Sequence, residues 1–133
     1  MKPQEMGVVF ADLNGLKWMN DEHGHDAGDR LLVRAATLLK IAFQQEQIYR
    51  IGGDEFVVLC PEISEKDLEE RVSQLRGLAD NTSDVSFAVG SVYCSEDYNI
   101  NGAIQTADER MYEDKKAYYQ NHPNKDRRRQ TDQ

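Results

Sequence analysis

The apolar positions along the chain change period several times, and each change indicates a new element of secondary structure. Met6 to Leu13 is a nearly unbroken apolar run, which predicts a strand buried on both faces at the centre of a sheet. From Asp26 to about Phe43 the period becomes helical, and Asp26 is expected to be the N-cap. The apolar stripe of this helix is Leu31, Ala35, Leu38 and Ala42, widened by Leu32, Leu39 and Phe43.

The second half of the chain alternates between strand and helix patterns. Two β-rich runs between Gln47 and Cys60 flank a glycine-rich link, a pattern typical of a β-hairpin. A helix is expected to start at Ser64, a strand to run from Val85 to Cys94, and a last helix to begin at Asn101. The stripes of these two helices are Leu68, Val72, Leu75 and Ala79, then Ile104, Ala107, Met111 and Lys115. This order predicts an α+β fold, a mainly antiparallel ferredoxin-like sheet with helices packed on it.

The composition is that of one globular domain. Its 133 residues, 39% hydrophobic and 30% charged, are enough to bury an ordinary core. A formal net charge of −8 opposes nucleic-acid binding, because a phosphate backbone requires a cationic face. Cys60 and Cys94 are expected to be reduced and buried, as in a cytosolic protein. No apolar run reaches the length of a membrane span and no signal peptide is visible, so we expect a cytoplasmic protein without membrane contact.

The link of the expected hairpin reads Gly52-Gly53-Asp54-Glu55-Phe56. A phosphate can lie close against glycine backbone, and adjacent carboxylates are the hard oxygen ligands that Mg²⁺ prefers. Asp12, at the end of the central strand, meets Asp54 and Glu55 if strand and hairpin are neighbours. Three clustered carboxylates repel one another, so a cation is expected among them. The alternatives are a plain turn for the pentapeptide and a helix-capping role for Asp12.

A second segment extends this motif. Phe10 to Lys17 leads into Asn20-Asp21 and then into Gly24-His25-Asp26-Ala27-Gly28-Asp29. Together with the glycine-rich link, this segment resembles the GGDEF family, the diguanylate cyclases. Further matches are Arg50, the segment Val85 to Gly90, and Ala107-Asp108, Met111-Tyr112 and Lys115. The resemblance covers about residues 6 to 120, implies the architecture of nucleotidyl cyclases and polymerase palms, and divides the chain into a GGDEF domain over residues 1–121 and a polar tail over 122–133.

The resemblance implies a role for each site residue. Asp12 and Asp54 would ligate Mg²⁺ (or Mn²⁺) with the backbone carbonyl of Leu13. Glu55 would be a second-metal ligand or the base for an attacking hydroxyl, so Asp54 and Glu55 count as both catalytic and metal-binding residues. Lys17, also counted as catalytic, and Lys115 would neutralise phosphates, although a lone helical lysine is otherwise plain surface charge.

Other residues would bind the nucleotide itself. Gly15 and Leu16 present backbone N–H groups at the start of a short helix, and Gly52 and Gly53 offer open backbone. Asn20 and Asp29 match the guanine readers of the family. A carboxylate accepts hydrogen bonds from guanine N1 and N2, whereas the adenine edge has the opposite polarity. The alternative for Asp29 is stabilisation of the helix dipole in the first turn.

The chain departs from the family pattern in three places. The helix with a Leu-Thr-x-Leu-x-Asn-Arg signature that usually precedes the central strand has no match, so we expect a trimmed or a shortened form of the domain. Tyr119 stands at the position of a phosphate-binding arginine, and Asn14 replaces a frequent aspartate. The product-inhibition motif Arg-x-x-Asp would fall on Phe43 to Glu46, which lacks the arginine.

The function implied by the resemblance is a bacterial diguanylate cyclase that condenses two GTP into cyclic di-GMP and releases pyrophosphate. Because one domain binds one GTP, catalysis requires a homodimer, and an N-terminal sensor domain or partner outside this chain is expected to control it. The alternative is a weak or inactive GGDEF domain that binds GTP and regulates a partner. A nucleic-acid polymerase palm is a third possibility, opposed by the net charge and the size.

Overall fold

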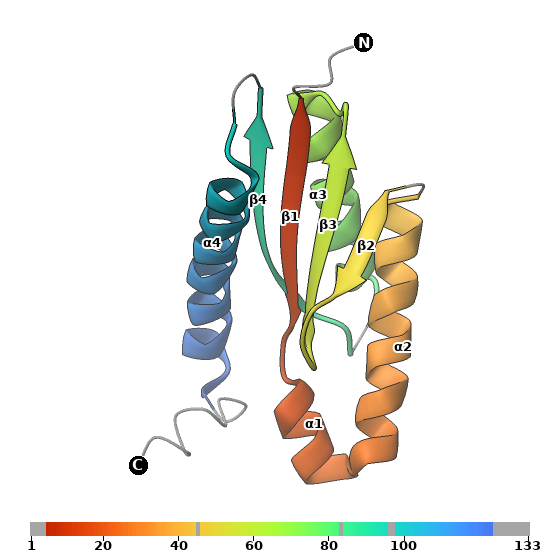
Figure 1. The fold of residues 1–133 in the computed structure, drawn as a ribbon. Helices are drawn as coiled ribbons and strands as arrows, with labels where there is room; N and C mark the ends of the chain where they lie inside the picture. The colour runs from red at the N-terminus through yellow and green to blue at the C-terminus, as the bar shows by residue number, and fades with distance from the viewer. Residues whose placement is uncertain (1–4, 45, 83, 96–97, 124–133) are drawn as a thin grey trace.

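The strands form one antiparallel sheet with the first strand at its centre. The computed structural model describes residues 5–44, 46–82, 84–95 and 98–123. Its elements are β1 (Met6–Leu13), α1 (Leu16–His23), α2 (His25–Ala42), β2 (Gln47–Arg50), β3 (Glu55–Pro61), α3 (Glu65–Asp80), β4 (Phe87–Cys94) and α4 (Ile100–Asn121). The strand order is β2-β3-β1-β4 (Figure 1). The predicted α+β fold with an antiparallel sheet and flanking helices is confirmed.

Helices cover both faces of the sheet, which explains the unbroken apolar run of β1. Alternate residues Val9, Ala11 and Leu13 pack in a core shared with α2 and α3. Val8 and Phe10, on the opposite face, pack in a second core shared with α4. A strand buried on both faces needs apolar residues at every position rather than at alternate ones. Among the described residues no helix is both long enough and apolar enough to cross a membrane.

The helix starts agree with the sequence in one case and differ in two. Ser64 caps α3 as expected, because its side chain accepts a hydrogen bond from the Asp67 N–H. Asp26 is not the N-cap of α2: Gly24 holds that position, and Asp26 lies in the first turn, where a negative charge still favours the helix dipole. The last helix begins before Asn101, because Asn99 caps it through its side chain.

The two cysteines differ in burial. Both are free thiols, but Cys60 is fully buried whereas Cys94, at the end of β4, is only half-buried. The expectation of two buried cysteines is therefore wrong for Cys94. Burial raises the pKa of both thiols, to about 12 for Cys60, which makes Cys60 a small apolar residue of the core.

The contact between α4 and β4 is close enough to involve backbone on both sides. A Cβ placed on Gly90 would lie 2.1 Å from the carbonyl oxygen of Ala107 and 2.2 Å from the amide nitrogen of Met111. The helix therefore lies directly on the strand, at a distance that only glycine permits. This packing fixes where the C-terminal half of α4, including Lys115 and Tyr119, stands relative to the end of β1.

We expect Gly90→Ala to destabilise the protein, because the added methyl group forces α4 away from the sheet. The free energy of unfolding should fall by roughly 1–3 kcal/mol, the usual cost of an overpacked core. Urea unfolding followed by circular dichroism measures it. Gly77→Ala is the matched control: a Cβ there meets no atom within 4 Å, and alanine in helix α3 should add about 0.5–1 kcal/mol. Equal stability of Gly90→Ala and the unaltered protein would contradict the tight packing of α4.

Candidate active site

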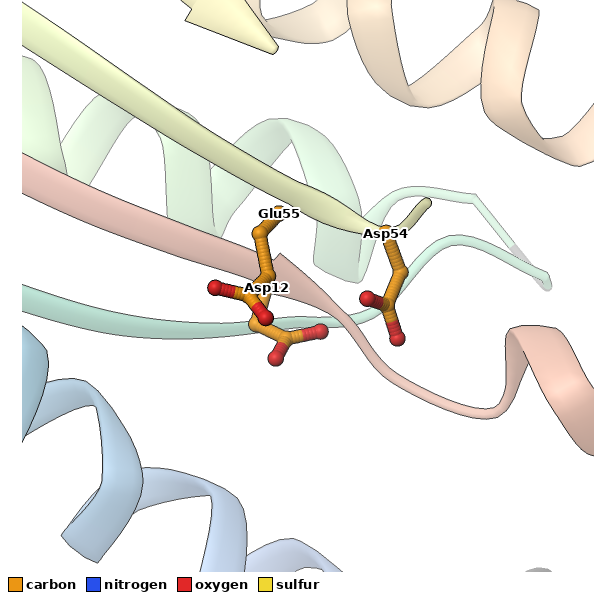
Figure 2. A group of neighbouring side chains, drawn as sticks. All are labelled: Asp12, Asp54 and Glu55. Atoms are coloured by element: carbon orange, nitrogen blue, oxygen red, sulfur yellow. The ribbon is translucent and has the colours of Figure 1, made fainter. Parts of the chain in front are cut away.

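Three carboxylates gather where β1 ends and β3 begins. The antiparallel register pairs Asp12 with Glu55, so both side chains project from the same face of the sheet. The Leu13 N–H donates to the carbonyl oxygen of Asp54 at 2.8 Å and thereby ties Asp54 to the end of β1. One carboxylate oxygen from each of Asp12, Asp54 and Glu55 lies within 4.8 Å of the others, and the three side chains converge in Figure 2.

Asp12 is the most deeply buried of the three. It is 1% exposed, and its Oδ2 accepts a 2.6 Å hydrogen bond from the Lys115 ammonium of α4. Burial raises the pKa of the Asp12 carboxyl to about 7; the Lys115 ammonium opposes this shift and Asp54 adds to it. Within the described residues, its second oxygen, Oδ1, has no hydrogen-bond partner. An unpartnered, buried carboxylate oxygen is costly and calls for a donor or a cation.

The residues around Asp12 fit a divalent cation. Three carboxylates supply oxygen atoms only, the ligand type that Mg²⁺ and Mn²⁺ take, and two of them are only half-buried. A cation would also offset the mutual repulsion of the carboxylates and satisfy Oδ1 of Asp12. The backbone of Leu13, expected to add a carbonyl ligand, lies next to Asp12 and is held by Asp54.

Helix α4 contacts the end of β1 and the turn after it at two points one helical turn apart. Besides the ion pair of Lys115, the Tyr119 hydroxyl accepts a 3.1 Å hydrogen bond from the Gly15 N–H. Gly15 was expected to offer that N–H to a phosphate, so in this structure the group is already engaged by α4. Sequence reasoning noted Tyr119 only as a missing arginine. Tyr119 follows Lys115 by one helical turn, and this spacing predicts that the two side chains lie on the same face of α4.

The glycine-rich link is braced by Arg50, a role that the sequence did not reveal. The Arg50 guanidinium donates to the carbonyl oxygens of Gly52 at 3.1 Å and Gly53 at 2.9 Å. A Cβ on Gly53 would meet no atom within 4 Å, and one on Gly52 would make only ordinary contacts with Glu55. Neither glycine has a positive φ. The fold therefore does not demand glycine here, and the absent side chains leave open backbone beside the carboxylates.

The two expected guanine readers lie close to each other on consecutive helices. Asn20 is on α1 and half-buried, whereas Asp29 is on α2 and exposed. A Cβ on Gly28 would lie 1.7 Å from Asn20 Oδ1, so the amide group sits directly over Gly28, the neighbour of Asp29. Only glycine at position 28 leaves room for the Asn20 side chain in this position. Lys17 is exposed on α1, and Leu16 is buried at its start.

Several of the sequence-based predictions involve residues that the structure does not describe. Phe43, at the position of the product-binding arginine, is 1% exposed and packs in the core, while Gln45 of the same motif is outside the described residues. The polar tail expected over residues 122–133 is described only as far as Pro123. Residues 1–4, where the chain would join a preceding helix, also lie outside it.

Comparison with known proteins supports one family. The profile of the diguanylate cyclase GGDEF domain matches residues 1–121. The chain is 32% identical over 119 residues to the bifunctional diguanylate cyclase/cyclic di-GMP phosphodiesterase MucR of Pseudomonas aeruginosa, which covers 82% of this chain and 17% of MucR. It is 32% identical over 120 residues to the probable diguanylate cyclase DgcI of Escherichia coli, covering 86% of this chain and 26% of DgcI.

A solved structure agrees with the sequence matches. The GGDEF domain of PA1120 (TpbB or YfiN) from Pseudomonas aeruginosa has a TM-score of 0.76 and 28% identity, covering 86% of this chain and 73% of that one. The chain spans only about a quarter or less of the length of the curated relatives, so the matched region is one part of each longer protein. The fold, the ordered motifs and the extent of the match lead to one conclusion: this chain belongs to the GGDEF family of diguanylate cyclase domains.

Proposed function

We propose that this domain is a diguanylate cyclase that converts two GTP into cyclic di-GMP and two pyrophosphates. The observation that carries the proposal is the convergence of Asp12, Asp54 and Glu55 within 4.8 Å, beside glycine backbone that the fold leaves open. Two relatives whose names include diguanylate cyclase match more than four-fifths of the chain at 32% identity. Within the proposal, the GGDEF domain occupies residues 1–121, acts in the bacterial cytoplasm, and receives its signal from a sensor domain or partner.

In the proposed reaction, the 3′-hydroxyl of each GTP attacks the α-phosphorus of the other. The new oxygen–phosphorus bond forms as the α–β anhydride bond breaks, and pyrophosphate leaves. Mg²⁺ held by Asp12, Asp54 and the Leu13 carbonyl would supply positive charge to the phosphates. In this proposal, Glu55 accepts the hydroxyl proton or holds a second cation. Its pairing with Asp12 in the sheet register keeps it within the cluster.

The remaining residues bind and orient the substrate in this proposal. Asn20 and Asp29 read the guanine edge, and the proximity of Asn20 to Gly28 supports their joint action. Lys17 and Lys115 balance phosphate charge, with the backbone of Gly15, Leu16, Gly52 and Gly53 close to the phosphates. One site holds one GTP, so two domains must face each other and the active form is a homodimer, at least during the reaction.

A second candidate function is a GTP-binding regulatory module with little or no turnover. Two contacts favour it: Lys115 is paired with Asp12, and the Gly15 N–H is bonded to Tyr119. Both groups would have to change partners before they could bind a phosphate, and Tyr119 adds no positive charge of its own. Incubation with GTP and Mg²⁺ followed by mass detection of cyclic di-GMP distinguishes the two functions.

We expect Asp54→Ala to abolish cyclase activity while leaving the fold intact. Asp54 is half-buried at the edge of the cluster, so its removal relieves repulsion, and the free energy of unfolding should stay equal or rise slightly. Product mass and urea unfolding measure the two effects. Glu69→Ala, an exposed carboxylate change on α3, is the control and should alter neither. More than a trace of turnover in Asp54→Ala would rule out the metal assignment.

Metal binding should weaken as the pH falls. Because the pKa of Asp12 is raised to about 7, the carboxyl holds a proton below that pH, and a cation must displace this proton to bind. Affinity for Mn²⁺, followed by electron paramagnetic resonance, should be about tenfold lower at pH 6 than at pH 8. In the Asp12→Asn control, affinity should be low and nearly independent of pH. A flat profile for the unaltered protein would remove Asp12 from the ligand set.

Base selectivity should depend on the contact between Asn20 and Gly28. Gly28→Ala should fold normally, since the side chain of Asn20 can turn away, but guanine discrimination should fall because Asn20 loses its place. Asp29→Ala should lose much of the same discrimination. Calorimetric titration with GTP and ATP in the presence of Mg²⁺ measures it, with Asp26→Ala, an exposed carboxylate on the same helix, as the control. Equal binding of ATP and GTP by the unaltered protein would exclude both assignments.

A further inference from the structure

A cleft of about 660 Å³ opens beside the β1–α1 turn and contains none of the three clustered carboxylates. It lies among the ends of α1, α3 and α4 and the segment before β4. Buried apolar side chains from α2, α3, the segment before β4 and β4 itself contribute to its lining: Leu31, Ala79, Val85 and Phe87. Its volume falls within the range of small-molecule pockets, which are mostly apolar with a few polar groups. The proposed cyclase reaction uses none of these four side chains, although Gly15, whose backbone it places close to the phosphates, also lines the cleft.

Two pairs of rings line this cleft, one pair from α1 and one from the end of α4. Trp18 and His23 make an edge-to-face contact, with centroids 5.6 Å apart and planes at 68°. Tyr118 and His122 are stacked, with centroids 4.2 Å apart and planes at 15°. Flat faces of this kind favour a flat ligand, since aromatic rings bind other planar π-systems by stacking.

The polar groups of the cleft include two carboxylates, which accept hydrogen bonds only. Asp80 and Asp84 lie in the lining, and Asp84 is paired with Arg34. Arg76, the arginine of the lining, donates to Asp114 at 3.1 Å and to the carbonyl of Val89 at 3.4 Å, so its charge is used inside the fold. A phosphate would therefore meet carboxylates without a free cation from this lining, which disfavours an anionic ligand.

Asn14 adds an unsatisfied acceptor to the lining. It is 4% exposed, its Nδ2 donates to Ser86 Oγ at 3.1 Å, and its Oδ1 has no partner in the described part of the chain. A buried acceptor without a donor is costly, and rotation of the amide towards the cleft would let a ligand N–H recover that cost. Asn14 and the two carboxylates thus favour a ligand that carries N–H donors.

We propose that this cleft binds an uncharged planar heteroaromatic compound with amino groups, of the aminopurine nucleoside class. The ring pairs stack on the base, and Asp80, Asp84 and Asn14 accept from its N–H groups. The site is separate from the three-carboxylate cluster and requires neither a metal ion nor a phosphate. The cleft meets the proposed phosphate site at Gly15, but the proposal does not require the cyclase reaction, and a binding measurement tests it.

The test is a fluorescence titration with 2-aminopurine riboside in the absence of divalent metal, because this probe loses fluorescence when it stacks on aromatic rings. We expect saturable quenching, and weaker competition by purine riboside, which lacks the amino group, than by adenosine. His122→Ala and Trp18→Leu should each weaken binding about fivefold or more, the effect of losing one stacked ring. Tyr112→Ala, an exposed aromatic change on α4 outside the cleft, should have no effect.

Three outcomes would overturn the proposal. The first is the absence of saturable quenching by the unaltered protein. The second is unchanged affinity in His122→Ala, which removes an exposed side chain and should leave the fold intact by circular dichroism. The third is loss of probe binding in Asp29→Ala, because the probe would then occupy the nucleotide site rather than this cleft.

Discussion

The buried ion pair between Asp12 and Lys115 joins the two ends of this fold. The partners are 103 residues apart in sequence, and their 2.6 Å contact places the last helix against the end of the first strand. Its geometry depends on Gly90, because a side chain there would force α4 outward and lift Lys115 away from Asp12. Breaking such a pair from one side leaves an uncompensated buried charge, which is much more costly than the pair itself.

The same ion pair offsets part of the repulsion among the three carboxylates. Lys115 supplies one positive charge to the most buried member, while Asp54 and Glu55 stay half-buried and partly hydrated. Only one oxygen of Asp12 is engaged, and the other remains unpartnered in the described residues. The cluster is therefore arranged around one lysine with an acceptor left over, and this is where a divalent cation fits best.

Much of this arrangement could be predicted because local patterns determine it. The apolar run predicted the bounds of β1, Met6 to Leu13, and the glycine-rich link predicted the hairpin. Asp12 and Glu55 then come together provided that β1 and β3 are neighbours in the sheet. The capping error had a local cause too: Gly24 already provides the backbone turn that starts α2, which leaves Asp26 inside the helix.

Other features depended on tertiary packing that no sequence pattern fixes. The relative position and rotation of the elements decide whether such contacts form. Examples are the hydrogen bond of the Tyr119 hydroxyl with Gly15 and those of the Arg50 guanidinium with the carbonyls of Gly52 and Gly53. Position 28 is similar, because the requirement for glycine there comes from Asn20, which lies on a different helix. Each of these contacts joins a side chain to backbone, and backbone groups carry no residue-specific signal in the sequence.

The ion pair also couples cation binding to phosphate binding in the proposed reaction. A divalent cation held by Asp12 would repel the Lys115 ammonium at short range, because both would carry positive charge in a buried site. Lys115 would then be free to pair with a phosphate of the bound triphosphate. An arginine at position 119 would add a second cation from the next turn of α4, whereas Tyr119 offers only a neutral hydroxyl already bonded to Gly15. In the proposed reaction, phosphate charge compensation from the positions of Lys115 and Tyr119 would come from Lys115, so the release of Lys115 from Asp12 would decide between turnover and binding without turnover.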